Sequence, residues 1–300
     1  MRNFNAPRLP ASRTPLVFVV LLLALSFTAG CNQAGTNQAQ KESVYDRVMR
    51  TGVIRAAYIE YPPALMRLTN SGEFTGIFYE VLVKAAENLD LRVEWTEEVG
   101  WGSQIEGLQT DRYDIVGSPV WANPTRGKLT TLSTPVYYSG IGVYTRDDET
   151  RFSQDSNWAS INSSDVRIST IDGETADLIA RSQFPEAQRV SLTQLSDISQ
   201  MFLEVANNKA DVAFAEPYYG YKFLENNPGS IKNIAAAQPI RTLGNCYMFR
   251  AGEFQFKHML DTAIQDLIQS GFVDEVIAKY EPFPNTFYRV NRVYRLVDAE

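Results

Sequence analysis

One arginine in this 300-residue chain stands where its charge would need a partner. Arg126 follows shortly after an apolar, strand-like run and precedes the aromatic pair Tyr137–Tyr138, so we expect it in a turn between packed elements. A guanidinium there is costly to bury unless a carboxylate meets it, because it carries a full charge and several hydrogen-bond donors. Arg126 is therefore a candidate carboxylate-binding residue. The alternative is a solvated arginine on a surface turn.

Other chemistry has little support in the residue types. The chain contains one histidine, His258, and it stands among the apolar residues of an expected helix. Its two cysteines are Cys31 and Cys246. We find no paired acid and base, no nucleophile beside a base, and no cluster with metal-ligand spacing. The sequence therefore predicts no metal site and no bound cofactor.

The N-terminus has the pattern of an export signal. A basic region without acids precedes the apolar run Leu16–Leu25, and the small residues Thr28-Ala29-Gly30 come directly before Cys31. This order resembles a bacterial lipoprotein box, in which the cysteine receives the lipid. We predict a signal peptide over residues 1–30 and a membrane-anchored lipoprotein in the periplasm. The alternative is an ordinary secretory signal followed by an incidental cysteine.

The mature chain is acidic. The formal net charge is −7, and removal of residues 1–30, which contain three arginines and no acids, makes it −10. An acidic exported protein is a poor partner for nucleic acid or for anionic lipid surfaces. Residues 31–44 are mostly polar and show no apolar period, so they are expected to form a flexible tether.

Strand-like and helix-like segments alternate after the tether. Val53–Tyr58, Leu91–Trp95 and residues 113–117 are expected strands, and apolar residues at helical spacing lie between them. A second series of the same kind extends from Val166 to Ala215. This order is typical of an α/β fold with mostly parallel strands and helices on both faces of the sheet.

Two such series followed by a helical return predict two lobes joined by two crossings, with a ligand cleft between them. We expect the crossings near Tyr137–Gly140 and Arg241–Cys246, and a return to helix from Tyr247. The chain beyond Tyr280 is expected to pack back on the body. The predicted limits are residues 45–138 and 243–300 for lobe 1 and residues 139–242 for lobe 2.

Several short motifs carry a family resemblance between Tyr45 and Tyr280. In this order and spacing they resemble the periplasmic solute-binding proteins of amino-acid ABC transporters, the bacterial extracellular solute-binding proteins of family 3. The resemblance implies the two-lobed periplasmic-binding-protein fold, type II. The motifs are Gly52-Val53-Ile54-Arg55 with Tyr61-Pro62-Pro63, Gly76–Leu82, Leu108–Asp114, Pro124-Thr125-Arg126, Ser133–Tyr138, Asp211-Val212-Ala213, and Gly271.

The resemblance also implies roles for particular residues. Arg126 would bind the ligand's α-carboxylate through two parallel hydrogen bonds, and Glu216 would receive its α-ammonium group. Gly173 and Thr175 open a helix, so backbone N–H groups and a hydroxyl would face the carboxylate from the second lobe. The full predicted ligand-binding set is Tyr61, Trp101, Ser118, Trp121, Arg126, Gly173, Thr175 and Glu216.

Each role has a simpler alternative. Glu216 is also explained as a solvated strand end, Thr175 as a helix-start residue, and Tyr61 and Trp101 as core aromatics. The chain departs from the family pattern at three positions, which are Pro119, Trp121 and Asn123. Trp121 is bulky and Pro119 lacks an N–H, so a narrower or more aromatic pocket is expected.

Three functions compete at this point. The first is a monomeric, lipid-anchored receptor that delivers an amino acid or related small carboxylate to an ABC permease. The second is an exported enzyme on the same fold, resembling cyclohexadienyl or arogenate dehydratases, with a cleft carboxylate as general acid. The third is a sensory or envelope-scaffold lipoprotein that uses no permease. The absence of an evident catalytic constellation favours the first.

Overall fold

The computed structural model describes residues 42–152 and 155–290. The predicted signal peptide, the lipidation residue Cys31 and most of the tether lie outside the described residues. The described chain enters helix α1 at Val44, the last residue predicted for the tether, with the Ser43 side chain accepting a hydrogen bond from the Asp46 N–H. Within these ranges, no helix has the length and apolar character needed to cross a membrane.

Helices and strands alternate through most of the described chain. The α-helices are α1 (Val44–Thr51), α2 (Ile77–Glu87), α3 (Gln104–Gln109), α4 (Pro124–Leu129), α5 (Thr175–Gln183), α6 (Ile198–Ala206), α7 (Pro217–Asn226), α8 (Phe254–Gln269) and α9 (Phe272–Tyr280), with a 3₁₀ turn over Asp155–Ile161. The strands are β1 (Val53–Tyr58), β2 (Met66–Arg67), β3 (Phe74–Thr75), β4 (Arg92–Glu98), β5 (Ile115–Trp121), β6 (Thr130–Leu132), β7 (Tyr137–Arg146), β8 (Arg167–Ile171), β9 (Gln188–Leu192), β10 (Val212–Ala215), β11 (Ile231–Asn233), β12 (Arg241–Arg250) and β13 (Tyr288–Arg289).

Two parallel groups of strands form the framework. Strand β1 pairs in parallel with β4 and β5, and β8 pairs in parallel with β9 and β10. These pairs agree with the predicted βαβ order. Strand β7 also pairs antiparallel with β10, β12 pairs antiparallel with β5, and β7 and β12 pair antiparallel with each other. The prediction did not include these antiparallel pairs. The reason is that these two strands carry the chain between the groups instead of returning through a helix.

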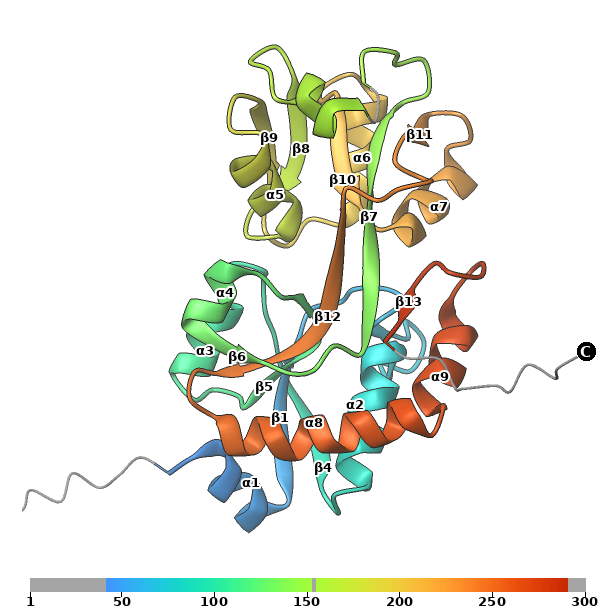
Figure 1. The fold of residues 1–300 in the computed structure, drawn as a ribbon. Helices are drawn as coiled ribbons and strands as arrows, with labels where there is room; N and C mark the ends of the chain where they lie inside the picture. The colour runs from blue at the N-terminus through green and yellow to red at the C-terminus, as the bar shows by residue number, and fades with distance from the viewer. Residues whose placement is uncertain (1–41, 153–154, 291–300) are drawn as a thin grey trace, which may run out of the picture. The chain divides into compact units, whose positions relative to one another are not determined.

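We call the elements around β1, β4 and β5 lobe 1, including α1–α4, α8, α9 and β13. The elements around β8, β9 and β10, with α5–α7 and β11, are lobe 2. Figure 1 shows β7 and β12 passing side by side between the lobes, and their pairing runs from Tyr137 opposite Asn245 to Ile141 opposite Arg241. Both predicted lobe limits, 138/139 and 242/243, fall inside these two strands.

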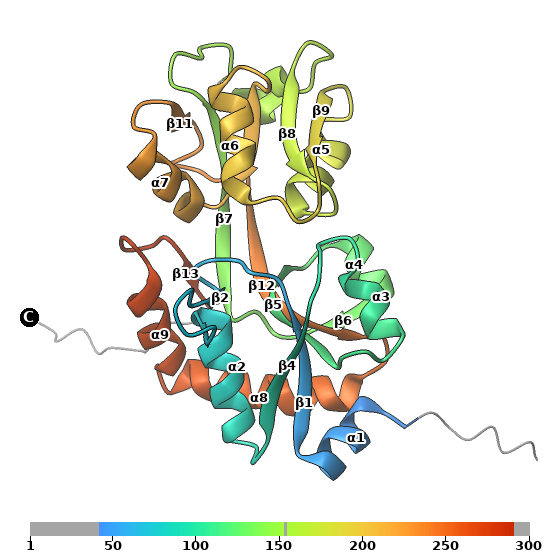
Figure 2. The same cartoon turned by 180° about the vertical axis from the view of Figure 1, so that it is seen from behind.

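Each lobe buries apolar residues between its helices and its strands. In lobe 1, α2 packs on β4 and β5 and also contacts α8 and α9, as the view from behind shows (Figure 2). In lobe 2, α5 and α6 both pack on β8 and β10. The helices bury the stripes that their spacing predicted, such as Ile77, Val81 and Ala85 on α2.

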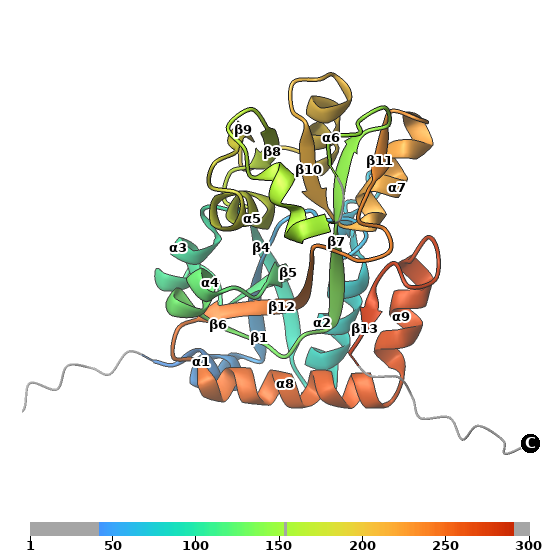
Figure 3. The ribbon, with the colours of Figure 1, turned by 45° about the horizontal axis from the view of Figure 1, so that its top comes forward.

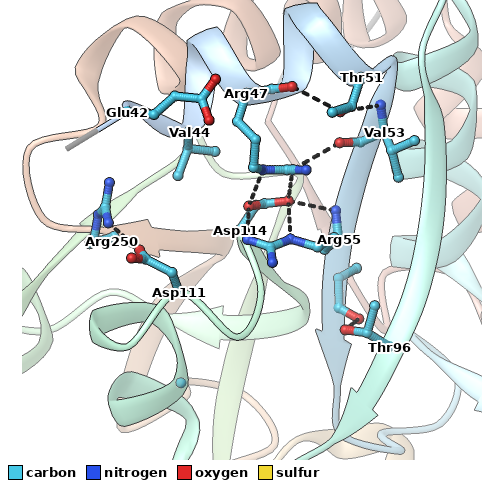
Figure 4. Close-up of polar contacts among 12 residues, drawn as sticks. Glu42, Val44, Arg47, Thr51, Val53, Arg55, Thr96, Asp111, Asp114 and Arg250 are labelled. Carbon is cyan, nitrogen blue, oxygen red and sulfur yellow. Dashed lines mark hydrogen bonds and ion pairs between the residues drawn. The ribbon is translucent and has the colours of Figure 1, made fainter.

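A buried carboxylate ties α1 to the lobe 1 strands (Figure 4). The Asp114 side chain is fully buried and pairs with both Arg47 and Arg55. Its Oδ1 accepts from Arg55 Nη2 at 2.9 Å, and its Oδ2 accepts from the Arg55 backbone N–H at 2.7 Å. Arg47 also donates to the Val53 carbonyl at 2.9 Å, so one cluster fixes the start of β1.

Replacing Asp114 with alanine is expected to lower the free energy of unfolding by about 2 kcal/mol, because two partly buried arginines would lose their shared counter-charge. The melting temperature should fall by roughly 4–8 °C. Thermal unfolding followed by circular dichroism measures this change. The matched control is Asp147→Ala at an exposed position, which should change it little. Equal effects of the two substitutions would contradict the role of the cluster.

Residues 281–290 follow α9 and pack against the crossing strand β7, where the sequence predicted packing on the body. Phe287 is fully buried, with its ring centroid 5.0 Å from that of Tyr137. Strand β13 pairs with β7 at Tyr137 and Tyr138, and Arg289 forms an ion pair with Glu281 at 2.7 Å. Residues 281–290 therefore cover β7 where it leaves lobe 1.

Two local predictions were wrong. The chain does not become helical at Tyr247, because that residue lies inside β12, and α8 begins only at Phe254. Residues 246–249 are apolar and all buried, so this run has no period that separates strand from helix. Arg126 lies in the short helix α4 instead of a turn, since Asn123 caps the helix and Pro124 is compatible with its first turn.

Candidate ligand-binding site

Arg126 is held on the lobe 1 side of the cleft by the start of α4. The Asn123 side chain accepts a hydrogen bond from the Arg126 backbone N–H at 2.9 Å, and Arg126 Nη1 donates to the Trp121 carbonyl at 3.0 Å. Only 5% of the residue is exposed. Asn123, a departure from the family pattern, therefore acts in the structure as a helix cap that fixes the arginine.

The guanidinium crosses to lobe 2. Arg126 Nη1 donates to Thr175 Oγ1 at 3.2 Å, and Nη2 donates to the Gly173 carbonyl at 3.4 Å. Figure 3 shows α4 of lobe 1 below α5 of lobe 2, which Thr175 opens. No carboxylate within the described ranges forms an ion pair with Arg126 at 4.0 Å or less. Burial lowers the pKa of Arg126, and the charge of Glu174 partly offsets this effect.

A small cavity lies beside this arginine. Its volume is about 10 Å³, close to the space that one water molecule needs. The lobes are therefore in contact around Arg126 in this structure. The walls come from both lobes and consist of Tyr61, Trp101, Pro119, Trp121, Arg126, Glu174 and Thr175.

Glu174 lines this cavity but was not among the predicted ligand-binding residues. Its side chain caps α5 by accepting from the Ala176 N–H, and the residue is 3% exposed. Burial raises the pKa of Glu174, while backbone hydrogen bonds and the charge of Arg126 act in the opposite direction. Its position between the predicted residues Gly173 and Thr175 could have pointed to Glu174 as a site residue. It was missed because a carboxylate does not match the hydroxyl and backbone donors that were expected there.

Glu216 lies at the end of β10, and Pro217 follows it as the first residue of α7. It occupies the N-cap position, yet its side chain makes no capping hydrogen bond. The residue is 1% exposed, and neither carboxylate oxygen has a hydrogen-bond partner among the described residues. The alternative interpretation of Glu216 as a solvated strand end is therefore wrong, because the residue is buried.

Burial raises the pKa of Glu216 to about 7. Nearby Ser139 and Tyr61 hydroxyls, which lie outside hydrogen-bonding geometry, lower the pKa by less than burial raises it. The negative charge of Glu174 adds to the increase. Glu216 therefore changes its ionisation close to neutral pH.

Tyrosine hydroxyls gather near this carboxylate. The hydroxyl oxygens of Tyr137 and Tyr219 are buried and have no hydrogen-bond partner within the described part of the chain. Burial raises the pKa of both tyrosines, and the charge of Glu216 raises it further. These oxygens and the Glu216 carboxylate form a buried group of hydrogen-bond acceptors, which suits a cation with several N–H donors.

Tyr61 lies between the arginine and the glutamate. Its ring centroid is 5.5 Å from that of Trp101, 6.4 Å from Trp121 and 4.9 Å from Tyr219. The first two rings belong to lobe 1 and Tyr219 to lobe 2. The aromatic residues thus fill the middle of the cleft and leave its charged groups at the two ends.

Two loops approach closely beside Trp101. Gly173 has φ of +79°, and a Cβ atom there would lie 2.9 Å from the Gly102 nitrogen. The Gly102 N–H donates to Gln194 Oε1 at 3.0 Å, which adds a second contact between lobes. A side chain at position 173 would force these loops apart, so glycine is required by both conformation and space.

The structure brings most of the predicted site residues together. Tyr61, Trp101, Trp121, Arg126 and Thr175 line the small cavity, and the Gly173 carbonyl contacts the arginine. Ser118 does not line it. Its hydroxyl accepts from the Ile59 N–H at 2.8 Å and donates to the Ile59 carbonyl at 2.7 Å, which joins β5 to the end of β1. The described residues contain no cluster that could hold a metal ion.

Comparison with known proteins shows the family to which this chain belongs. Residues 53–283 match the bacterial extracellular solute-binding proteins, family 3. A cyclohexadienyl dehydratase of Pseudomonas aeruginosa is 25% identical over 267 residues, which cover 88% of this chain and 93% of the relative. A probable amino-acid ABC transporter-binding protein of Haemophilus influenzae is 35% identical over 79 residues, covering 26% of this chain and only 30% of that protein.

Solved structures show the same fold. The ancestral amino acid-binding protein AncCDT-1, a precursor of cyclohexadienyl dehydratase, has a TM-score of 0.66 at 21% identity and covers 80% of this chain and 99% of its own. The cysteine-binding protein of Campylobacter jejuni has a TM-score of 0.66 at 16% identity, with 80% and 94% covered. The periplasmic-binding-protein fold that the sequence predicted is confirmed. This chain belongs to the bacterial extracellular solute-binding proteins of family 3.

Proposed function

We propose that this protein is the solute-binding receptor of an ABC importer and that it binds an amino acid or a related small carboxylate by hinge closure. The observation that carries the proposal is Arg126, a buried guanidinium that reaches from lobe 1 to lobe 2 and pairs with no carboxylate of the described chain. A ligand carboxylate would supply the missing negative charge. It would also add a contact that exists only while the lobes are together.

The other end of the cleft suits an ammonium group. A primary ammonium has three N–H donors, and Glu216 with the Tyr137 and Tyr219 hydroxyls supplies acceptors that have no partner among the described residues. A ligand held by Arg126 at one end and Glu216 at the other carries both a carboxylate and an ammonium group, as an amino acid does. Tyr61 would contact its middle.

Hinge motion would admit the ligand. The cavity of about 10 Å³ beside Arg126 is far too small for an amino acid, so entry requires separation of the lobes. The crossing strands β7 and β12 are the elements that can bend, because they run through both lobes. A ligand that contacts both lobes favours the closed state in proportion to those contacts.

A thermal-shift screen tests the proposal. The purified mature protein is heated with each of the twenty proteinogenic amino acids and with small mono- and dicarboxylates. A ligand that binds only the native state raises the melting temperature in a concentration-dependent way. At least one amino acid or carboxylate should do so. The absence of any shift across the panel at millimolar concentration would contradict the proposed function.

Lipid anchoring at Cys31 is part of the proposal. Replacing Cys31 with serine is expected to release the protein from the membrane fraction of the producing cells into the soluble extracytoplasmic fraction, because the lipid attachment site is lost. Fractionation and immunoblotting measure the distribution. Cys246→Ser, a buried position, is the matched control and should stay with the membrane. If the Cys31 variant remains membrane-bound, the lipoprotein assignment falls.

A second function has one specific observation in its favour. Glu216 is a buried carboxyl group with a pKa of about 7, the range expected for a general acid at neutral pH. A relative of 25% identity is a cyclohexadienyl dehydratase. Incubation of the purified protein with prephenate and with arogenate, followed by detection of the aromatic product, separates the two functions. Turnover that a Glu216→Gln variant lacks would favour the enzyme.

A further inference from the structure

The charged groups buried at the cleft do not balance. Arg126 is 5% exposed, Glu174 3% and Glu216 1%. With both carboxylates ionised, these groups sum to one negative charge. None of the three forms an ion pair within 4.0 Å in the part of the chain that the structure describes. A buried charge without a partner is costly, so the site is suited to an additional positive charge.

Glu174 is close enough to act on both of the other groups. Its charge raises the pKa of Arg126 and also that of Glu216. A zwitterionic ligand brings one charge for Arg126 and one for Glu216 and leaves the Glu174 charge unmatched. A ligand with a second cationic group matches all three.

A larger pocket of about 250 Å³ shares a wall with the small cavity. Trp101 lines both spaces. A ligand side chain that runs along this indole would therefore extend from the small cavity into the larger pocket. The larger pocket is lined by Glu60 and Glu98 from lobe 1 and Asp197 from lobe 2, and its wall contains no lysine or arginine from residues 42–152 and 155–290. An indole face and nearby carboxylates both attract a cation.

We propose that the ligand of this protein carries a net positive charge, as a basic amino acid does, and that Glu174 determines this preference. The proposal rests on the proposed receptor function. The α-carboxylate pairs with Arg126 and the α-ammonium group with Glu216. The side-chain cation passes Trp101 toward the larger pocket, where Glu60, Glu98 and Asp197 face it.

Matched ligands test the charge directly. L-Arginine and L-citrulline have nearly the same shape and differ by one positive charge, as do L-lysine and L-norleucine at the end of the side chain. Isothermal titration calorimetry at pH 8, where Glu216 is ionised, should give at least tenfold tighter binding for the cationic member of each pair. Equal or tighter binding of the neutral member would overturn the proposal.

Glu174→Gln keeps an oxygen for the helix cap and removes the charge. It should reduce the arginine-to-citrulline preference by about tenfold, through weaker arginine binding, while citrulline binding stays the same or improves. Glu186→Gln at an exposed position of lobe 2 is the control and should preserve the preference. Equal loss of both ligands in a folded Glu174→Gln protein would show a structural role and contradict the proposal.

A second variant does not depend on the buried position. Glu60 and Glu98 are exposed, so the double variant Glu60→Gln/Glu98→Gln should fold normally. It should weaken arginine binding about threefold and leave citrulline unchanged, with a smaller dependence of arginine binding on salt. If a neutral amino acid proves to be the tight ligand, the receptor function stands and this inference falls. If neither an amino acid nor a small carboxylate binds, both fall.

Discussion

Replacing Arg126 with alanine is expected to weaken binding of the amino acid or carboxylate by more than about a hundredfold. Arg126 is the only cation among the described residues that line the cavity, so the ligand carboxylate would be buried without a partner after the substitution. Truncating one member of a buried, hydrogen-bonded charge pair costs roughly 2–5 kcal/mol, and each 1.4 kcal/mol is tenfold in affinity. Calorimetric titration with the best ligand of the screen measures this loss.

The control comes from the same short helix. Lys128 is an exposed residue of α4, so Lys128→Ala should bind the ligand as the parent protein does. The melting temperature of unliganded Arg126→Ala shows whether the variant is folded, and the loss of the ligand-induced shift then reports on binding alone. Tight binding by a folded Arg126→Ala protein would remove Arg126 from the site.

Ligand affinity is also expected to fall as the pH drops through about 7. Burial raises the pKa of Glu216 to about 7, and an ammonium group binds the ionised carboxylate. Above this pH affinity should be nearly constant, and well below it each pH unit should reduce affinity by up to about tenfold as the group becomes protonated. Titrations between pH 5.5 and 8.5 measure the profile.

Stability of the unliganded protein should respond in the opposite direction. Because the folded-state pKa of Glu216 is above its unfolded value of 4.5, the folded state binds the proton more tightly. The contribution of this group is therefore favourable below about pH 4.5 and is lost as the pH rises to about 7. The ligand-induced rise in melting temperature should consequently be larger at pH 8 than at pH 6.

The Glu216→Gln variant distinguishes the titration of Glu216 from that of Glu174, because burial raises the pKa of Glu174 as well. The variant should bind an amino acid about a hundredfold more weakly at pH 8, through loss of the charge partner, and its pH profile should be flatter. Glu225→Gln, at an exposed position of the same helix α7, is the control. A Glu216→Gln protein with the parental pH profile would assign the titration to another group.

Much of the framework was predictable because it depends on neighbouring residues. Alternating apolar patterns placed β1, α2, β8 and β10, and the residues at the strand ends, such as Glu216, followed from them. The local rule failed where burial was continuous. The buried apolar residues 246–249 show no periodicity, so the part of β12 from Tyr247 onward was predicted as helix. The pairing of β12 with β5 and β7 makes it a strand, and those partners are distant in the sequence.

The sequence by itself determined the two-lobed α/β fold, the start of a helix at Gly173 and Thr175, and Arg126 and Glu216 as the charged residues of interest. Only the tertiary structure decided which groups share one cleft. Ser118 is engaged by Ile59, and Glu174 is turned inward beside Arg126. Burial, hydrogen-bond pairing and pKa depend on atoms that distant segments bring together, and spacing along the chain does not encode these contacts.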